Sequence, residues 1–251
     1  MRIAVAGATG RIGQRTMAAL RQAGQTPVPI SRSGGVDVLT GAGLDAALAG
    51  AKTVIDVTNT TAADPEETVR FFHTATASLL AAEQRAGVGH HVLLSIVGVE
   101  LVPDNPHYRG KIAQEALVTQ GPVPATIVRA TQFFDFPLMV TSWNRDGDTV
   151  PLPPLLMRPI SPDDVASVLA EVAVAGPQPG FEVAGPDNQD MIDMARRSLA
   201  SRGETLRLVP TWDGPLGTAM AGNVLLPGAR ARITPTSFDD WLSSGAAAGA
   251  S

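Results

Sequence analysis

The sequence predicts an α/β fold built on a doubly wound parallel sheet, followed by a smaller region of less regular pattern. Short apolar segments alternate with segments of helical period through the first half of the chain. Nearly every residue of these short segments is apolar, which is typical of strands covered on both faces. Strands that alternate with helices indicate right-handed βαβ units and therefore a parallel sheet.

Five strands and two helices are predicted in the first half. The expected strands are residues 2–6, 26–30, 53–57, 91–97 and 125–130. A helix over 11–24 ends at Gly24, a suitable C-cap. A second helix over 64–87 begins with Asp64 as N-cap and Pro65 at the first helical position.

In the second half of the chain, the sequence pattern predicts helices over 161–176, 187–203 and 237–244. It also predicts strands over 181–185 and 205–209. Proline-rich residues 149–160 cannot form a central strand throughout. We expect a nucleotide-binding core and a smaller substrate-binding region. The core comprises 1–132 and 157–176, the smaller region 133–156 and 177–244, and a flexible tail 245–251.

Composition excludes several function classes. The 19 basic and 24 acidic residues give a net charge of −5, which disfavours nucleic acid or an anionic membrane as partner. The chain has no cysteine, and its four histidines lack metal-ligand spacing, so no metal site is expected. No signal segment or membrane-length apolar stretch is visible, so the expected location is the cytoplasm.

The segment "GATGRIG", residues 7–13, follows the first strand and opens the first helix. In this context one glycine permits a tight turn, another lets backbone N–H groups approach a pyrophosphate, and a third allows helix and strand to pack closely. Thr9 and Arg11 add a hydroxyl and a positive charge. A dinucleotide-binding loop is therefore predicted, with an ordinary glycine-rich turn as the alternative.

The end of the second strand bears on the choice of cofactor. NAD-specific sites carry an acid there for the ribose 2′-hydroxyl, whereas this chain has Ser31, Arg32 and Ser33, with no acid before Asp37. An arginine flanked by hydroxyls can pair with a 2′-phosphate. NADP is therefore favoured over NAD, and the alternative is that Arg32 is a solvated loop residue.

Together, "GATGRIG", "SRS", "DVL", "YRGKIAQE" and "ATIVRATQFF" resemble the NmrA-like group of atypical short-chain dehydrogenases/reductases. The resemblance covers residues 1–135 closely and extends loosely through "RPISPDDVA" and "FEVAG". It implies an NAD(P)-binding Rossmann fold with a smaller C-terminal substrate region. It implies pyrophosphate contacts by Gly7, Thr9, Gly10, Arg11 and Ile12, 2′-phosphate contacts by Ser31, Arg32 and Ser33, adenine contacts by Asp37 and Val38, and nicotinamide contacts by Thr58 and Asn59.

The wider superfamily uses a tyrosine and a lysine four residues apart, helped by a serine. Here the single tyrosine, Tyr108, precedes Lys111 by three residues, which changes their helical offset from about 40° to about −60°. By resemblance, Lys111 with Glu115 is a cofactor-ribose anchor and a candidate proton donor, and Ser95 occupies the place of the serine. Catalytic candidates are thus Lys111, Tyr108 and Ser95.

Each candidate has an alternative. Tyr108 can be a surface or pocket-wall aromatic, Lys111 an i,i+4 partner of Glu115, and Ser95 a loop hydrogen-bonding group. The histidines at 90 and 91 are expected to be structural.

The substrate pocket is expected to use the segment after the fifth strand. Gln132, Phe133, Phe134 and Phe136, with Trp143, would form an apolar wall, although core packing is an alternative for the phenylalanines. Such a wall favours an uncharged, cyclic or conjugated substrate.

Three functions remain open at this point. The first is an NADPH-dependent reductase of carbonyl, quinone or enone compounds. The second is a non-catalytic redox sensor that binds dinucleotide and acts through protein contacts, which the altered Tyr–Lys spacing motivates. The third is an epimerase or isomerase with a retained nicotinamide, which would want a usable Tyr–Lys pair. The chain is a possible homodimer.

Overall fold

The computed structural model describes residues 1–60, 64–214 and 216–245, and the chain forms two compact units. Unit 1 comprises Met1–Arg129 and Val165–Phe181, and unit 2 comprises Ala130–Asp164 and Glu182–Ser251. The sequence-based division differs in its bounds. It groups residues 130–132 and 157–164 with the core, whereas they lie in unit 2, and it leaves 177–181 out of the core, whereas they lie in unit 1. Residues 246–251 of the expected tail lie outside the described residues.

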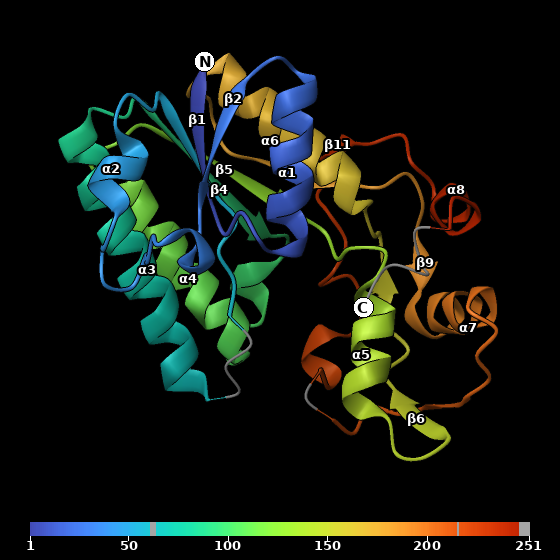
Figure 1. The fold of residues 1–251 in the computed structure, drawn as a ribbon. Coiled ribbons are helices and arrows are strands. Elements are labelled where there is room, and N and C mark those ends of the chain that lie inside the picture. The colour runs from blue at the N-terminus through green and yellow to red at the C-terminus, as the bar shows by residue number, and fades with distance from the viewer. Residues whose placement is uncertain (61–63, 215, 246–251) are drawn as a thin grey trace. The chain divides into compact units, whose positions relative to one another are not determined.

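Parallel pairing of the strands confirms the predicted α/β fold class. In unit 1 the strand order is β5-β4-β3-β1-β2, and the β1–β2, β1–β3 and β3–β4 pairs are parallel (Figure 1). In unit 2, β8 pairs with β11, also in parallel. These strands are β1 (Arg2–Ala6), β2 (Thr26–Ile30), β3 (Thr53–Asp56), β4 (His90–Ile96), β5 (Ala125–Ala130), β8 (Phe181–Ala184) and β11 (Arg232–Ile233).

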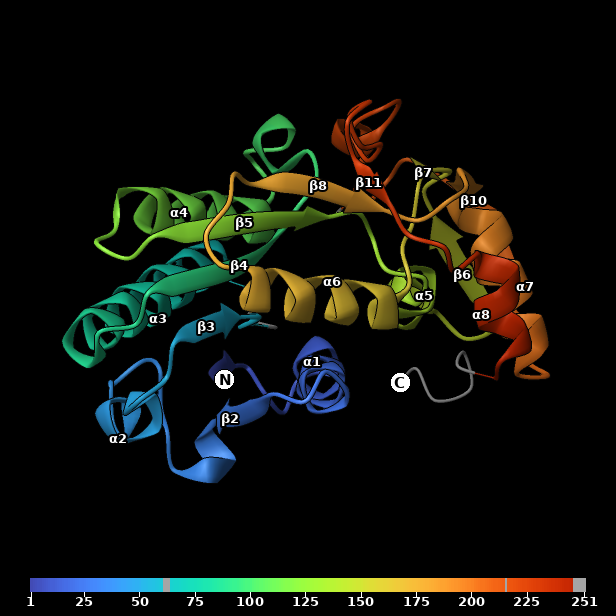
Figure 2. The same cartoon turned by 90° about the horizontal axis from the view of Figure 1, so that it is seen from above.

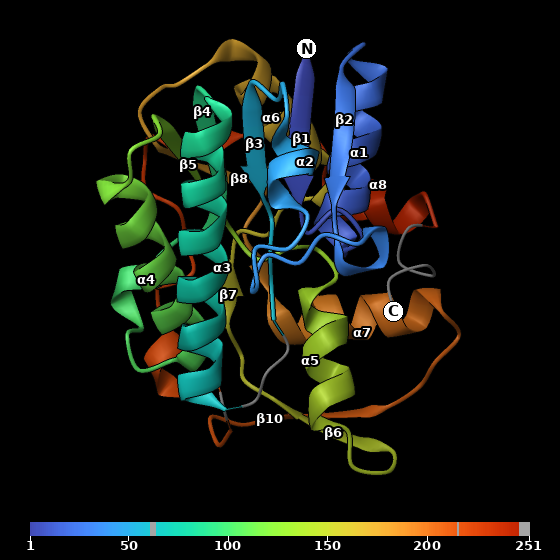
Figure 3. The ribbon, with the colours of Figure 1, turned by 60° about the vertical axis from the view of Figure 1, so that its left-hand side comes forward.

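Helices cover both faces of the unit 1 strands. They are α1 (Arg11–Gln22), α2 (Leu44–Leu48), α3 (Pro65–Ala86), α4 (Pro106–Gln120) and α6 (Pro162–Ala175), with short 3₁₀ turns η1 (Arg32–Gly34) and η2 (Val99–Leu101). α3 and α4 lie side by side on one face (Figure 3), and α1 and α6 cover the other (Figure 2). The sheet is therefore doubly wound, as predicted.

The predicted capping residues set the limits of α3. The Asp64 side chain accepts a hydrogen bond from the Glu67 N–H at 2.7 Å, and Pro65 is the first helical residue. At the other end Gly87 has φ +67°, the left-handed conformation that glycine adopts without a steric penalty. Asp64 and Gly87 thus fix the length of the helix that covers β3 and β4.

The core of unit 1 joins α2 and α3 to the strands. Leu44 and Leu48 of α2 and Leu79 of α3 pack in one buried cluster with Ala4 of β1 and Val54 of β3. Every one of these side chains is withdrawn from water, which is the main favourable contribution to folding. The packing holds the strand ends that carry the candidate site.

Unit 2 is built from shorter elements. They are α5 (Phe136–Asn144), β6 (Thr149–Leu152), β7 (Leu156–Met157), β9 (Gln189–Asp190), α7 (Met191–Ser201), β10 (Arg207–Pro210), η3 (Thr218–Met220) and α8 (Phe238–Ser243). β6 pairs with β10 in parallel and β7 with β9 in antiparallel orientation. The sequence did not predict α5, which begins within the phenylalanine-rich segment. The proline-rich stretch forms only the short strands β6 and β7, consistent with its composition.

Candidate cofactor and catalytic site

The candidate site of unit 1 lies at the carboxyl ends of its parallel strands. From β1 the chain forms β2 on one side and then crosses to β3 on the other, so the strand order reverses at β1. Open α/β sheets bind ligands in the crevice at such a switch point. The glycine loop follows β1 directly and therefore lies at this position.

Two glycines of the loop are required by close backbone contacts. Gly7 has φ +82°, and a Cβ there would lie 2.9 Å from the Val57 carbonyl oxygen. A Cβ on Gly13 would lie 2.0 Å from the Gly7 carbonyl oxygen. No side chain fits at either position without moving backbone, so the loop packs against the end of β3 only with glycine.

The N-terminus of α1 fits an anionic group. Gly10 is its N-cap and provides no side-chain cap, and no acidic residue lies in the first turn. The uncapped N–H groups and the helix dipole favour a negative charge. Burial and the neighbouring Arg15 lower the pKa of Arg11, a direction that a nearby anion would oppose. Thr9 is exposed beside the helix start, and Ile12 is buried beneath it.

The end of β2 presents Arg32 on an exposed turn. Arg32 begins η1, and the hydroxyls of Ser31 and Ser33 on either side hydrogen-bond to each other at 3.2 Å. The first acid, Asp37, accepts a hydrogen bond from the Leu39 N–H at 2.8 Å, within its own turn. Val38 is half-buried against the α2–α3 core. The polar surface after β2 is therefore supplied by Arg32 and two serines.

Two buried hydroxyls lie near the ends of the next strands. Thr58, two residues beyond β3, is 6 % exposed, and Ser95, near the end of β4, is 3 % exposed. Neither hydroxyl has a hydrogen-bond partner among the described residues. Unsatisfied buried polar groups are rare in folded proteins, and a polar ligand is one way to satisfy them. These two positions therefore fit a bound dinucleotide, while Asn59 is exposed beside them.

Lys111 lies on α4 in a buried hydrogen-bond network. Its Nζ donates to the Leu94 carbonyl oxygen at 3.0 Å and to Gln114 Oε1 at 2.8 Å. It also lies 4.8 Å from the centre of the Phe72 ring, within the range of a cation–π contact. An ammonium group has three N–H donors, so these two bonds leave one for a ligand.

Burial lowers the pKa of Lys111 to about 8, although the carboxylates of Asp56 and Glu115 act in the opposite direction. Tyr108 is also buried, one helical turn earlier. Arg129 binds the Glu115 carboxylate through two hydrogen bonds at 2.9 and 2.5 Å, whereas Lys111 Nζ donates to Leu94 and Gln114.

Sequence reasoning missed the partners of this lysine. Gln114 Nε2 donates to Asp56 Oδ2 at 2.9 Å and to Thr76 Oγ1 at 3.1 Å. Gly110, on the same helix, faces the Phe72 ring, because a Cβ there would lie 2.3 Å from that ring. The glycine therefore permits close packing of α4 on α3. A polar residue at the end of an otherwise apolar strand, as in "TVID", was the available signal for Asp56.

The histidines of β4 serve other buried pairs in unit 1. His91 Nδ1 hydrogen-bonds to Glu83 Oε1 at 2.9 Å, and His90 Nε2 to Thr126 Oγ1 at the same distance. Burial raises the pKa of Glu83. Burial alone would lower the pKa of His91, but the Glu83 carboxylate raises it above its ordinary value. Both pairs are consistent with the expected structural role.

The predicted substrate residues belong to unit 2. Phe134 is fully buried, with its ring 5.5 Å from that of Phe238 and 5.8 Å from that of Trp241, so it is a core residue. This burial agrees with the core-packing alternative, because neighbouring aromatic rings cover Phe134. Gln132 is buried, Phe133 and Phe136 are half-buried, and Trp143 is 62 % exposed.

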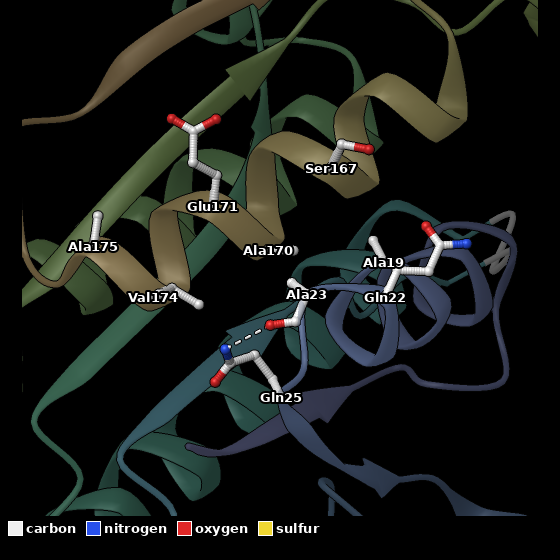
Figure 4. A pocket seen from close by; sticks show the side chains of 9 residues that line it. All are labelled: Ala19, Gln22, Ala23, Gln25, Ser167, Ala170, Glu171, Val174 and Ala175. Carbon is white, nitrogen blue, oxygen red and sulfur yellow. Dashed lines mark hydrogen bonds between the residues drawn. The ribbon is translucent and has the colours of Figure 1, made fainter.

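A separate hollow of about 540 Å³ lies between α1 and α6 (Figure 4). On the α1 side, the first lining residue is Ala19, in the C-terminal half of the helix. The hollow therefore lies toward the opposite end of α1 from its N-cap, Gly10. Glu171 is the only ionisable residue among the nine that line it. A surface with one acid and no base does not suit a pyrophosphate, so we do not assign the dinucleotide to this hollow.

Two other kinds of site were considered among residues 1–60, 64–214 and 216–245, namely membrane spans and metal sites, and neither is present there. Within these ranges, no helix combines the length and apolar character needed to cross a membrane. Nor do three or more histidine, aspartate or glutamate side chains gather there in an arrangement that could bind a metal ion.

Comparison with known families identifies the family of the chain. Residues 7–175 match the model of a family described as NAD(P)H-binding, and the chain therefore belongs to that family. The match begins at Gly7, the first glycine of the loop. The predicted Rossmann-type NAD(P)-binding relationship is confirmed, and the NmrA-like subgroup stays a prediction. No curated protein matches the chain.

Solved structures share the fold at low identity. A NADPH-dependent quinone oxidoreductase from Escherichia coli has 14% identity and a TM-score of 0.71 over 96% of this chain and 98% of that chain. A dTDP-4-dehydrorhamnose reductase from Bacillus anthracis in complex with NADP has 13% identity and a TM-score of 0.75 over 97% of both chains. An Agrobacterium tumefaciens short-chain dehydrogenase/reductase superfamily protein with bound NAD has 20% identity and a TM-score of 0.69 over 100% of this chain and 97% of that chain.

Proposed function

We propose that the protein is an NADPH-dependent reductase of small uncharged carbonyl, quinone or enone compounds. The observation that carries the proposal is the uncapped N-terminus of α1, which follows Gly7 and Gly10. It lies at the carboxyl ends of the strands, as does the exposed Arg32. The quinone oxidoreductase and the NADP-bound reductase among the solved structures agree with this reaction class.

In this proposal the glycine loop and Arg11 hold the pyrophosphate, and Arg32 with its serines holds the 2′-phosphate. Thr58, Asn59 and the hydroxyl of Ser95 face the nicotinamide side. When bound, NADPH supplies the hydride. The chain supplies the proton from Lys111 Nζ, whose pKa of about 8 suits proton exchange near neutral pH, from Tyr108, or through a bound water.

The test is a titration of the protein with NADPH and NADH, with Arg32→Ala alongside. Loss of a charge-assisted contact to the 2′-phosphate costs about 1.5–3 kcal/mol, so NADPH affinity should fall roughly 10- to 100-fold while NADH affinity stays constant. Equal affinity of the unsubstituted protein for both cofactors would remove the role of Arg32. Turnover is then followed by NADPH absorbance with quinones, enones and aldehydes against small charged acids. A clear preference for charged acids would contradict the substrate class.

A second candidate is a dinucleotide-binding sensor without turnover. The observation in its favour is that Lys111 is buried and donates to two protein acceptors, Leu94 O and Gln114 Oε1. Tight NADPH binding with no oxidation across the whole substrate panel would favour the sensor. The homodimer and the cytoplasmic location stay predictions.

A further inference from the structure

Gln114 connects the two charged groups of the buried network in unit 1. We propose that Gln114 is a positioning residue, whose amide transmits the charge of the Asp56 carboxylate to the Lys111 ammonium and holds that ammonium in register with the loop after β3. The inference deepens the proposed function, on which its significance for cofactor chemistry rests. It concerns the position of the Lys111 ammonium and its pKa, and it does not depend on the substrate.

The hydrogen-bonding capacity of the Gln114 side chain is used on both sides. Its Oε1 accepts from Lys111 Nζ at 2.8 Å, and its Nε2 donates to Asp56 Oδ2 at 2.9 Å and to Thr76 Oγ1 at 3.1 Å. An ammonium can only donate and a carboxylate can only accept. The amide therefore has one chemically acceptable orientation, with oxygen toward the lysine and nitrogen toward the aspartate. In this orientation the amide dipole is aligned between a positive and a negative charge.

The second carboxylate oxygen of Asp56 extends the network to the backbone. Asp56 Oδ1 accepts from the Thr58 N–H at 2.8 Å, in the loop after β3. That loop touches the glycine loop, because a Cβ on Gly7 would lie 3.2 Å from the Thr58 Cα. A continuous chain of hydrogen bonds thus runs from Lys111 through Gln114 and Asp56 to the backbone beside the candidate pyrophosphate loop.

Charged and titratable groups surround Lys111 from several elements. Asp56 of β3 and Glu115 of α4 favour its charged form, and His107 of α4 is a further titratable neighbour. Arg129 of β5 already occupies the Glu115 carboxylate. The Phe72 ring and the Leu94 carbonyl complete the surroundings. Among the described residues, the hydrogen bonds that join the Asp56 carboxylate to the lysine pass through Gln114.

The experiment uses the fact that the chain contains two lysines, Lys52 and Lys111. The full-length protein is labelled with ¹³Cε-lysine, and the two NMR signals are followed against pH without cofactor. Lys52→Arg assigns the signals. In Gln114→Leu and in Asp56→Asn, the Lys111 pKa should fall by about one unit, because each change removes an interaction with the charged form.

A double-mutant cycle separates transmission through the amide from direct attraction through space. If Gln114 transmits the charge, Asp56→Asn should shift the Lys111 pKa much less in the Gln114→Leu background than in the unsubstituted protein. Equal shifts in both backgrounds, or no shift in Gln114→Leu, would overturn the proposal. If Gln114→Leu does not fold, Gln114→Met, which is unbranched like glutamine, takes its place in the cycle.

Thr126→Val is the matched control. It removes a buried hydroxyl of unit 1 that bonds His90 and the Gln178 carbonyl, in a separate network, and it should leave the Lys111 pKa unchanged. Because the titration contains no cofactor, its outcome is independent of the proposed function. Failure to bind NADPH would reject the proposed cofactor site, whereas a failed cycle would reject only the role of Gln114.

Discussion

The glycine loop and the lysine network are two parts of the candidate site in unit 1 that are built by opposite means. The loop depends on positions without side chains, since Gly7 and Gly13 leave no room for a Cβ. The network depends on buried polar side chains, with Lys111, Gln114 and Asp56 joined by short hydrogen bonds. The loop offers backbone N–H groups and a helix dipole, whereas the network offers a titratable amine.

This difference determines how each region should respond to change. Adding atoms to the loop forces backbone to move, and the effect should fall on folding and anion binding together. Changing the network should alter charge and pH dependence, because its members interact through electrostatics in a medium of low dielectric. A substitution that added a methyl group to the loop without harm, or a network substitution without pH effect, would break the distinction.

The largest effect is expected for Gly13→Ala. Its Cβ would lie 2.0 Å from the Gly7 carbonyl oxygen, so the loop and the start of α1 must separate. We expect a loss of about 3 kcal/mol in the free energy of unfolding, and NADPH binding weaker by at least about tenfold. Denaturant unfolding and a fluorescence titration with NADPH measure the two effects.

Gly89→Ala is the matched control for that substitution. A Cβ on Gly89 would meet only the Lys52 carbonyl oxygen, at 3.8 Å, which is an ordinary contact. This variant should bind NADPH as tightly as the unsubstituted protein. Normal NADPH affinity in Gly13→Ala would show that the glycine loop does not hold the pyrophosphate.

A smaller effect is expected for the pH dependence that Lys111 contributes. Its pKa is lowered from 10.5 to about 8 in the folded protein, chiefly by burial. Between these values the unfolded chain binds a proton that the folded protein does not, so the lysine makes stability rise as pH increases from about 8 to about 10.5. This contribution amounts to about 2.5 kcal/mol over that interval. The free energy of unfolding is measured over the same pH series for the unsubstituted protein and for Lys111→Met, and the difference between them gives the contribution of the lysine. Parallel pH curves for the two proteins would contradict this contribution.

The glycine loop could be predicted from the sequence because its requirements are local. Three glycines at a spacing of three, directly after a buried strand, specify the turn, the close approach and the helix start within residues 7–13. The long helix α3 was predictable for the same reason, since Asp64 and Gly87 mark its limits in the sequence itself. The bounds of α1, α3 and α6 in the structure differ from the expected ones by at most two residues, whereas no bounds were expected for α2 and α4.

The lysine network could not be predicted, because its partners are distant in sequence. Gln114 bonds to Asp56, 58 residues away, and to Thr76, 38 residues away. No local pattern specifies that α3, α4 and β3 meet at this point. The aromatic neighbours of Phe134 could not be predicted for the same reason, since they lie on α8, more than a hundred residues later. Spacing within one helix indicated Lys111 and Tyr108, but only tertiary packing reveals what Lys111 contacts.

The smallest effect on the free energy of unfolding is expected for Gly110→Ala. This substitution tests whether a glycine inside the lysine network has the same steric role as the loop glycines. This glycine lies inside the network region but acts as the loop glycines do, because a Cβ there would lie 2.3 Å from the Phe72 ring. Overpacking costs about 1–3 kcal/mol, and the better helix propensity of alanine offsets about 1 kcal/mol, so the net loss should be about 1 kcal/mol.

A second background identifies the cause of that loss. In the Phe72→Leu background the aromatic ring is gone, and Gly110→Ala should become neutral or stabilising in urea unfolding. The same loss in both backgrounds would mean that Phe72 is not the obstacle. Because Lys111 Nζ lies 4.8 Å from the centre of the same ring, Gly110→Ala should also displace the ring from the ammonium and lower the Lys111 pKa. A steric change at Gly110 would then be measured as a shift in the pKa of Lys111. The close packing of a glycine and the charge of a lysine would thus be coupled within one helix.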